Sequence, residues 1–235
     1  LFFILYFISR MENTFEMPEM PLDILRIIAS QNISAYRSML YLPVFARSLS
    51  VSTRTDFMIK FGYYVKITKK FTEWYLNGDR HRVDGPAIEH ADGTKVWYFN
   101  GKYHRIDGPA VEDDKGNKMW YLNGKHHRVD GPAIENPDGT KEWYLNGDRH
   151  RVDGPAIEFA DGTKEWYLNG KLHRVDGPAI EHAEGSKYWY LNGRNHRIDG
   201  PAVEYADGSK AWCLNGKLHR DDGPAIEHST GIKEW

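Results

Sequence analysis

Apolar and polar residues alternate along most of this chain in a pattern that recurs every 23 residues. Each copy begins with Trp-Tyr-Leu, as at 166–168, and reaches a second apolar step, Pro-Ala-Ile, as at 178–180. Short alternating runs of this kind are typical of half-buried β-strands. All eight tryptophans keep the interval, which gives seven complete copies: Trp74, Trp97, Trp120, Trp143, Trp166, Trp189, Trp212 and Trp235. A fixed period without insertions predicts a stacked repeat architecture.

Two turns divide each copy into strands. The Asn-Gly step at 77–78 favours a two-residue type I′ turn, because that turn needs positive φ at both central residues. This turn would place Trp74 opposite His81, and directly paired residues share one face of a sheet. We therefore expect a Trp–His framework in every copy, with histidines at His81, His104, His127, His150, His173, His196 and His219.

The second turn, Asp-Gly at 92–93, leaves the register open. We favour a two-residue turn, which would place Ile88 opposite Trp97 and would put Trp, Leu, Ile and His on one face. A three-residue loop would instead pair Glu89 with Lys95 and would exchange the faces beyond it.

The predicted fold is mainly β: a small N-terminal helical module, then an elongated antiparallel sheet of repeated hairpins. We assign 1–19 to an N-terminal extension, 20–50 to the helical module, 51–73 to a linker and capping strand, and 74–235 to the seven repeats. In the capping strand we expect Val65 opposite Trp74 and Lys66 opposite Glu73.

The two ends carry separate expectations. The first ten residues are apolar but shorter than the roughly 20 needed to span a bilayer. We expect them to be translated sequence upstream of a start at Met11, with the tail of a truncated membrane or signal segment as the alternative. The chain stops on Trp235, the first residue of a further copy, which suggests a cut C-terminus.

Charge and cysteine content narrow the function classes. The formal net charge is −2, so no global basic field favours nucleic acid. Residues 1–73 carry nine Lys and Arg against six Asp and Glu, and the repeats are net −5. A single cysteine, Cys213, excludes an internal disulfide framework and fits a reducing, intracellular compartment.

The His-Arg-x-Asp segment, as at 81–84, is the most tempting catalytic motif. It recurs seven times, whereas an active site is built once from different parts of a chain, so we expect a structural role in which Arg pairs with Asp or Glu. Equivalent histidines would lie two strands apart, about 9.6 Å, too far for one zinc ion to bind both. We therefore predict no enzyme, no cofactor, no metal, and no favoured nucleic-acid site.

The repeats resemble the MORN family in their aromatic strand, the Asn-Gly-Lys turn, the His three residues after that Gly, and the closing Asp-Gly. The resemblance covers 74–235 and implies an elongated single-layer sheet used for scaffolding, partner binding and sometimes membrane association. The family's Tyr-x-Gly opening is absent, and Arg82 stands where the family usually has Gly. The array is most similar to the divergent variant of large DNA viruses and some bacteria.

The segment 20–49 resembles an F-box, the helical motif that docks on the Skp-type adaptor of cullin ubiquitin ligases. That resemblance implies a docking surface formed by Pro21, Ile24, Leu25, Ile28, Leu40 and Val44. The alternative is a plain helical cap on the sheet, since the apolar spacing alone requires nothing more.

From these features we expect a non-enzymatic protein-interaction adaptor. In this hypothesis the F-box-like module contacts a Skp-type adaptor, and the sheet binds an unknown target at variable positions beside the Asn-Gly turns, such as 79–80, 102–103 and 148–149. A viral origin would place it in the host cytoplasm. The alternative is a repeat scaffold or a peripheral membrane-associated structural protein with a helical cap.

Overall fold

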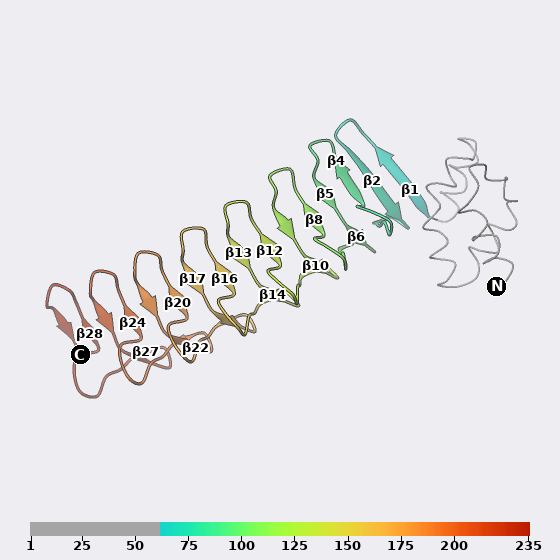
Figure 1. Ribbon diagram of the computed structural model, residues 1–235. Coiled ribbons are helices and arrows are strands. Elements are labelled where there is room, and N and C mark those ends of the chain that lie inside the picture. The colour runs from blue at the N-terminus through green and yellow to red at the C-terminus, as the bar shows by residue number, and fades with distance from the viewer. Residues whose placement is uncertain (1–61) are drawn as a thin grey trace, which may run out of the picture. The chain divides into compact units, whose positions relative to one another are not determined.

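The computed structural model describes residues 62–235, and the unit Tyr63–Trp235 forms an elongated array of antiparallel β-strands (Figure 1). The expected helical module at 20–50, with its six docking residues, lies outside the described residues, as does the extension at 1–19. Within 62–235 all regular structure is strand, so that part of the chain has no helix able to cross a membrane.

The strands are short, and most have two residues. The first three are β1 (Tyr63–Ile67), β2 (Phe71–Leu76) and β3 (Asp79–Arg80). The strands on the Asp-Gly side are β4 (Ile88–His90), β5 (Lys95–Val96), β8 (Val111–Glu112), β9 (Lys118–Met119), β12 (Ile134–Glu135), β13 (Lys141–Glu142), β16 (Ile157–Glu158), β17 (Lys164–Glu165), β20 (Ile180–Glu181), β21 (Lys187–Tyr188), β24 (Val203–Glu204), β25 (Lys210–Ala211), β28 (Ile226–Glu227) and β29 (Lys233–Glu234). The strands on the Asn-Gly side are β6 (Tyr98–Phe99), β7 (Lys102–Tyr103), β10 (Tyr121–Leu122), β11 (Lys125–His126), β14 (Tyr144–Leu145), β15 (Asp148–Arg149), β18 (Tyr167–Leu168), β19 (Lys171–Leu172), β22 (Tyr190–Leu191), β23 (Arg194–Asn195), β26 (Cys213–Leu214) and β27 (Lys217–Leu218).

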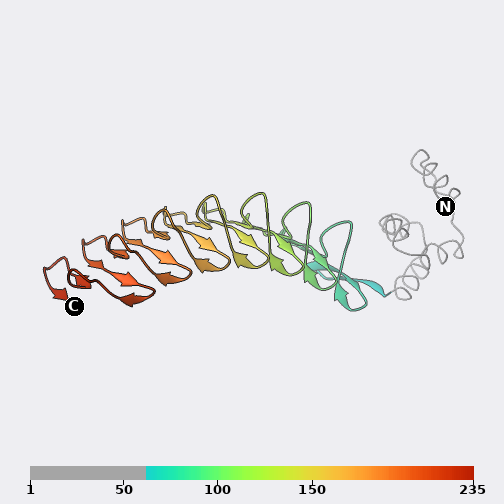
Figure 2. The same ribbon diagram turned by 90° about the horizontal axis from the view of Figure 1, so that it is seen from below.

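One continuous sheet runs through the whole array. It follows the chain from β1 to β2, then β4, β5, β8 and onward to β29, each strand antiparallel to the next. Figure 2 shows that equivalent strands of successive copies lie side by side along this direction. The predicted meander of stacked hairpins is therefore confirmed.

From the second copy onward each Asn-Gly turn closes a separate two-stranded arm, of which β6–β7 is the first, whereas Asn77-Gly78 joins β2 to β3 within the continuous sheet. Asn77 has φ 52° and Gly78 φ 91°, the two positive angles of a type I′ turn, and the pairing of Tyr75 with Arg80 matches the predicted register. Neighbouring arms are joined by sparse backbone bonds, such as Gly101 N–H to the carbonyl of Arg80 at 2.9 Å. The strands break between Arg80 and Ile88, at the Asp-Gly-Pro step, as expected from the missing backbone N–H of Pro86.

The favoured register of the Asp-Gly turn was wrong. Ile88 pairs with Val96 and Glu89 with Lys95, the three-residue alternative. The loop leaves three residues between His90 and Thr94, whose backbones bond at 2.9 Å, and Gly93 takes φ 102°. The Asp92 carboxylate accepts the Thr94 N–H at 2.8 Å, so it holds the extra residue in place.

This register defines two faces of the array. The tyrosine face carries Glu73, Tyr75, Arg80, Ile88 and His90 with their equivalents in later copies, and the tryptophan face carries the alternate positions. Ile88 therefore shares a face with the tyrosines, and Glu89 shares a face with the tryptophans, which is the reverse of the arrangement expected for these two residues.

The tightest packing lies on the tyrosine face and at the proline step. Ala87 is fully buried and clusters with Ile88, Val96 and Tyr98. The alanines at the same place in copies two to six are also fully buried, so a larger side chain has no room there.

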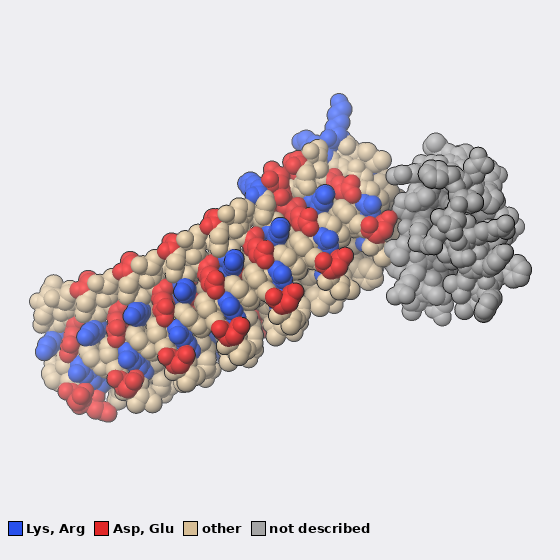
Figure 3. Space-filling view, in the orientation of Figure 1, with Lys and Arg blue, Asp and Glu red and all other residues tan. Residues whose placement is uncertain are grey.

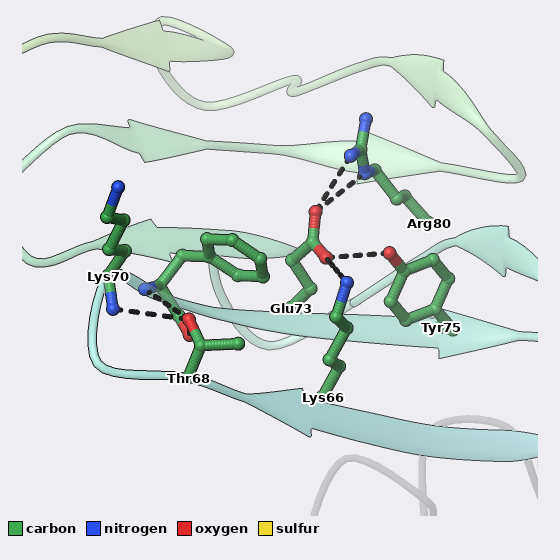
Figure 4. Close-up of polar contacts among 7 residues, drawn as sticks. Lys66, Thr68, Lys70, Glu73, Tyr75 and Arg80 are labelled. Carbon is green, nitrogen blue, oxygen red and sulfur yellow. Dashed lines mark hydrogen bonds and ion pairs between the residues drawn. The ribbon is translucent and has the colours of Figure 1, made fainter.

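The strand β1 caps the first copy as predicted, with Val65 opposite Trp74 and Lys66 opposite Glu73. Figure 4 shows the polar side of this cap. The Glu73 carboxylate accepts from the Tyr75 hydroxyl at 2.7 Å and from Arg80 at 2.7 Å, and Lys66 lies 3.9 Å away. These partners hold the pKa of Glu73 below its usual range although burial opposes the shift.

Candidate functional site

The His-Arg-x-Asp segment of each copy is occupied by framework contacts. In the first copy, the Arg82 guanidinium lies 4.0 Å from the centre of the Trp74 ring. It donates to Asp84 at 2.9 Å, to the carbonyl of Pro86 at 3.1 Å and to Glu89 at 2.9 Å. One side chain thereby ties the aromatic strand, the loop and the following strand together.

Glycine on the far side completes this arrangement. A Cβ on Gly85 would lie 3.0 Å from the Arg82 Cζ, so the guanidinium packs between the Trp74 ring and bare backbone. The φ of Gly85 is outside the left-handed region, so the requirement is space and not backbone conformation. We call this unit the Trp–Arg–Gly sandwich.

The sandwich repeats with little change in all seven copies. The Arg–Trp ring distances stay between 3.9 and 4.1 Å. The arginines are Arg82, Arg105, Arg128, Arg151, Arg174, Arg197 and Arg220. The predicted pairing of Arg with Asp or Glu is confirmed, and Arg pairs with both. Sequence reasoning had not placed Arg on the Trp ring; the spacing of eight residues gives no such signal without the register.

The framework histidines join each copy to the next. His81 N–H donates to the carbonyl of Trp74 at 3.0 Å, which confirms that these two residues are opposed. The ring Nδ1 of His81 lies 2.8 Å from the Asn100 side-chain oxygen and accepts the Asn100 backbone N–H at 3.1 Å. Because Asn100 occupies the turn of the following copy, the histidine couples neighbours. Equivalent bonds bring together His104 with Asn123, His127 with Asn146, His150 with Asn169, His173 with Asn192, and His196 with Asn215.

The tryptophan face carries the same pattern of opposed acidic and basic residues in every copy. Glutamate and lysine oppose each other across every strand pair of the continuous sheet from β4 to β29, from Glu89 and Lys95 to Glu227 and Lys233. Figure 3 shows the resulting rows of acidic and basic side chains along the array. Alternating charges of this kind leave no net positive stripe of the sort that a nucleic-acid backbone requires.

The tyrosine face changes from copy to copy. The residue paired with the tyrosine is in turn Arg80, Tyr103, His126, Arg149, Leu172 and Asn195, and in the seventh copy Leu218 pairs with Cys213, which replaces the tyrosine. In copies two to four these side chains interleave with the tyrosines as one stack. Measured between ring centres, Tyr103 lies 4.9 Å from Tyr121, and His126 lies 4.0 Å from Tyr121 and 5.1 Å from Tyr144. Burial in the stack lowers the pKa of His126.

Two further variable rows lie on this face. The residue before each Trp is Glu73, Val96, Met119, Glu142, Glu165, Tyr188 and Ala211. The residue at the start of each Asp-Gly loop is His90, Asp113, Asn136, Phe159, His182, Tyr205 and His228. Side chains of the two rows are in contact: the ring of Tyr188 meets those of His182 and Tyr205 edge-on, with ring centres 5.5 Å and 5.9 Å apart.

Sequence reasoning found only part of this surface. It marked the residues beside the Asn-Gly turn, but these divide between the faces: Arg80 lies on the tyrosine face, and Asp79 lies exposed on the other. It missed the rows of Glu73 and His90, which the three-residue register would have revealed. In residues 62–235 no group of three His, Cys, Asp or Glu side chains is placed to hold a metal ion.

No protein-family model matches the chain, and no curated protein is detectably similar to it in sequence. The repeated antiparallel hairpins are consistent with a MORN-like array.

Proposed function

We propose that the array is a non-enzymatic protein-interaction module whose recognition surface is the variable part of the tyrosine face. One observation carries this proposal. The residues identical in every copy form the sandwich, the framework histidines and the row of opposed Glu and Lys side chains, the Glu–Lys ladder, whereas three rows on the tyrosine face vary along the array. Residues that only hold a repeat together have no reason to differ between copies. Most of the variation lies on this face, although the Asp79 row on the other face also exchanges Asp for Lys or Arg. Variation concentrated on one face is what a surface that matches a particular partner requires.

The chemistry of the face divides along the array. Copies two and three offer aromatic and apolar groups, including Tyr103, which is 36% exposed. Copy four adds an ion pair, with Arg149 donating to Glu142 at 3.1 Å and to the Tyr144 hydroxyl at 3.1 Å. In copy five, Glu165 keeps the bond from Tyr167 at 3.0 Å, but Leu172 replaces the arginine. Aromatic and arginine anchors of this kind dominate protein interfaces, and several weak patches on one rigid array add through avidity.

A catalytic role for the repeats is disfavoured by the engagement of their candidate residues. His81 is bonded to Asn100, and Arg82 and Asp84 are bonded to each other. A general acid or base must instead be free to reach a substrate proton.

The larger proposal is an adaptor: the F-box-like segment at 20–50 docks on a Skp-type adaptor, and the array presents a target to the ligase. It rests on the resemblance of Pro21, Ile24 and Leu25 to that motif. The alternative remains a scaffold or peripheral membrane protein. The Glu–Lys ladder and the net charge of −5 in the repeats weaken the membrane form of that alternative, because anionic lipids attract basic surfaces.

The recognition surface is tested with neighbouring substitutions on opposite faces. A full-chain variant with Tyr103→Ser, Arg149→Ser and Leu172→Ser changes the tyrosine face. Its matched control, Lys102→Ser, Asp148→Ser and Lys171→Ser, changes the adjacent residues on the other face. Affinity purification from eukaryotic cell extract with quantitative mass spectrometry should show proteins lost with the first variant and retained with the control. Equal retention by both would refute the surface.

The adaptor proposal has its own test with the full chain. Purified Skp-type adaptor should be captured by the protein and lost with Pro21→Ala, Ile24→Asp and Leu25→Asp combined, while the target set bound by the array stays the same. Absence of capture by the unaltered chain, with its repeats folded by Trp fluorescence, would refute the ligase role. Binding to vesicles containing phosphatidylserine in that case would favour the membrane alternative.

A further inference from the structure

A row of exposed apolar side chains lies outside both the framework and the tyrosine face. It consists of the residue between Arg and Asp in the His-Arg-x-Asp segment, which is apolar in six of the seven copies: Val83, Ile106, Val129, Val152, Val175 and Ile198. From Ile106 to Ile198 each is 83–87% exposed, whereas Val83 is 47% exposed. We call these six residues together the comb and each one of them a tooth.

The loop does not need an apolar residue at this position. The seventh copy carries Asp221, whose side chain is 92% exposed. In that copy Arg220 still lies 3.9 Å from the Trp212 ring and still pairs with Asp222 at 2.9 Å. The sandwich therefore forms with a charged residue at the comb position. Scattered exposed apolar residues need no explanation, but six that recur at one interval, at a position where the loop does not need them, do.

We propose that the comb is a self-association surface that packs against the comb of a second copy of this chain. Successive teeth belong to equivalent positions two strands apart, about 9.6 Å. A second copy repeats that interval at every tooth, so all six contacts form together and their contributions add. An interface in which the same patch meets itself is the usual form of a homodimer.

Other occupants fit the interval less well. A helix offers equivalent residues every seven positions, about 10.5 Å, and would drift about 4.5 Å out of step over the six teeth. An extended strand reaches about 10 Å in three residues, but an odd step turns the side chain to the opposite face. The period thus favours another array of the same repeat.

The seventh copy sets the direction of the pair. A parallel alignment would place the two Asp221 carboxylates opposite each other, with like charges in contact. An antiparallel alignment avoids that contact and matches Val83 with Ile198, Ile106 with Val175, and Val129 with Val152. Substituting three teeth at one end of the chain then alters every one of the six contacts.

The test is the oligomeric state of the full chain by sedimentation velocity over a concentration series. The unaltered protein should form a dimer. Val152→Thr, Val175→Thr and Ile198→Thr keep the branched shape and remove apolar surface, so the dimer dissociation constant should rise on the order of 100-fold or more. The same residues changed to Asp, which the seventh copy tolerates, should give a monomer at all concentrations.

A matched control changes the same number of exposed residues away from the comb. Lys102→Asp, Lys125→Asp and Lys171→Asp place aspartate where copies one and four already carry Asp79 and Asp148, and this variant should dimerise like the unaltered protein. The proposal is overturned if the unaltered chain is monomeric throughout, or if the threonine and aspartate variants, with native Trp fluorescence, associate as strongly as the control. Association through another segment would give that second result.

Discussion

Removing one arginine from the middle of the array should unfold it more easily than any exposed substitution nearby. In copy four, Arg151 lies 4.0 Å from the Trp143 ring and donates to Asp153 at 3.0 Å, to the Pro155 carbonyl at 3.1 Å and to Glu158 at 2.9 Å. Its side chain is 21% exposed, so these contacts are partly shielded from water. Arg151→Ala loses all four at once.

The magnitude follows from the exposure of each partner. A half-desolvated cation–π contact contributes about 1 kcal/mol, and the hydrogen bond to a carbonyl about 1 kcal/mol. The side chain of Asp153 is 84% exposed, so water replaces most of what it loses, whereas the pair with Glu158, which is 36% exposed, adds about 0.5 kcal/mol. The free energy of unfolding should therefore fall by about 2.5 kcal/mol.

Urea unfolding followed by Trp fluorescence measures this change through the midpoint and slope of the transition. Arg151→Lys should lose most of the same free energy, because an ammonium cannot stack flat on Trp143 and bond three oxygens in one plane. Asp153→Asn, which removes one exposed partner, should shift the midpoint far less than Arg151→Ala does. A loss under about 0.5 kcal/mol for Arg151→Ala, or none for Arg151→Lys, would refute the sandwich as the main tie within a copy.

Three further results are expected. Gly154→Ala places a Cβ 2.9 Å from the Arg151 Cζ and should displace the arginine side chain. It should therefore destabilise the protein by no more than Arg151→Ala does, and it should be nearly neutral in the Arg151→Ala background. A double-mutant cycle measured by urea unfolding tests both results. The hydrogen bond from Arg151 holds the pKa of Asp153 below its usual range. The stabilisation from this bond is therefore complete above the unfolded pKa near 4 and disappears as the pH falls through the folded value. Thermal unfolding between pH 6 and pH 2 should show this loss of stability, and Asp153→Asn should make the loss smaller. Asn169→Gly keeps the positive φ but removes the side-chain oxygen that lies 2.9 Å from His150 Nδ1. It should lower the urea midpoint more than Asn77→Gly does, because the residue 19 positions before Asn77 in the sequence is Met58 and not a histidine.

Local chemistry made much of the array predictable. The Asn77-Gly78 step determines its own turn because few other residue pairs accept two positive φ angles, and the register of the two strands that it joins follows by counting. The same rule failed at Asp92-Gly93. Two-residue and three-residue loops both accept that pair, and the choice depends on the bond between Asp92 and the Thr94 N–H and on which side chains then share a face.

The recognition surface was harder to predict for the same reason. A slip of one residue moves a whole strand's side chains to the other face, so the rows of Glu73 and His90 could not be assigned until the loop length was known. The sandwich depends on contacts between residues eight and three positions apart that no periodicity marks, such as Arg82 with Trp74 and with Gly85.

The arginine in every His-Arg-x-Asp segment also has a physical explanation in these contacts. A long side chain at Arg82 needs both a surface to lie on and space to lie in. Trp74 supplies the surface at 4.0 Å, and Gly85 supplies the space, since a Cβ there would meet the guanidinium at 3.0 Å. The three residues form one unit, so substituting any of them alone removes the benefit of the other two. That dependence accounts for their joint presence in all seven copies, while the tyrosine face, which has no part in the unit, differs from one copy to the next.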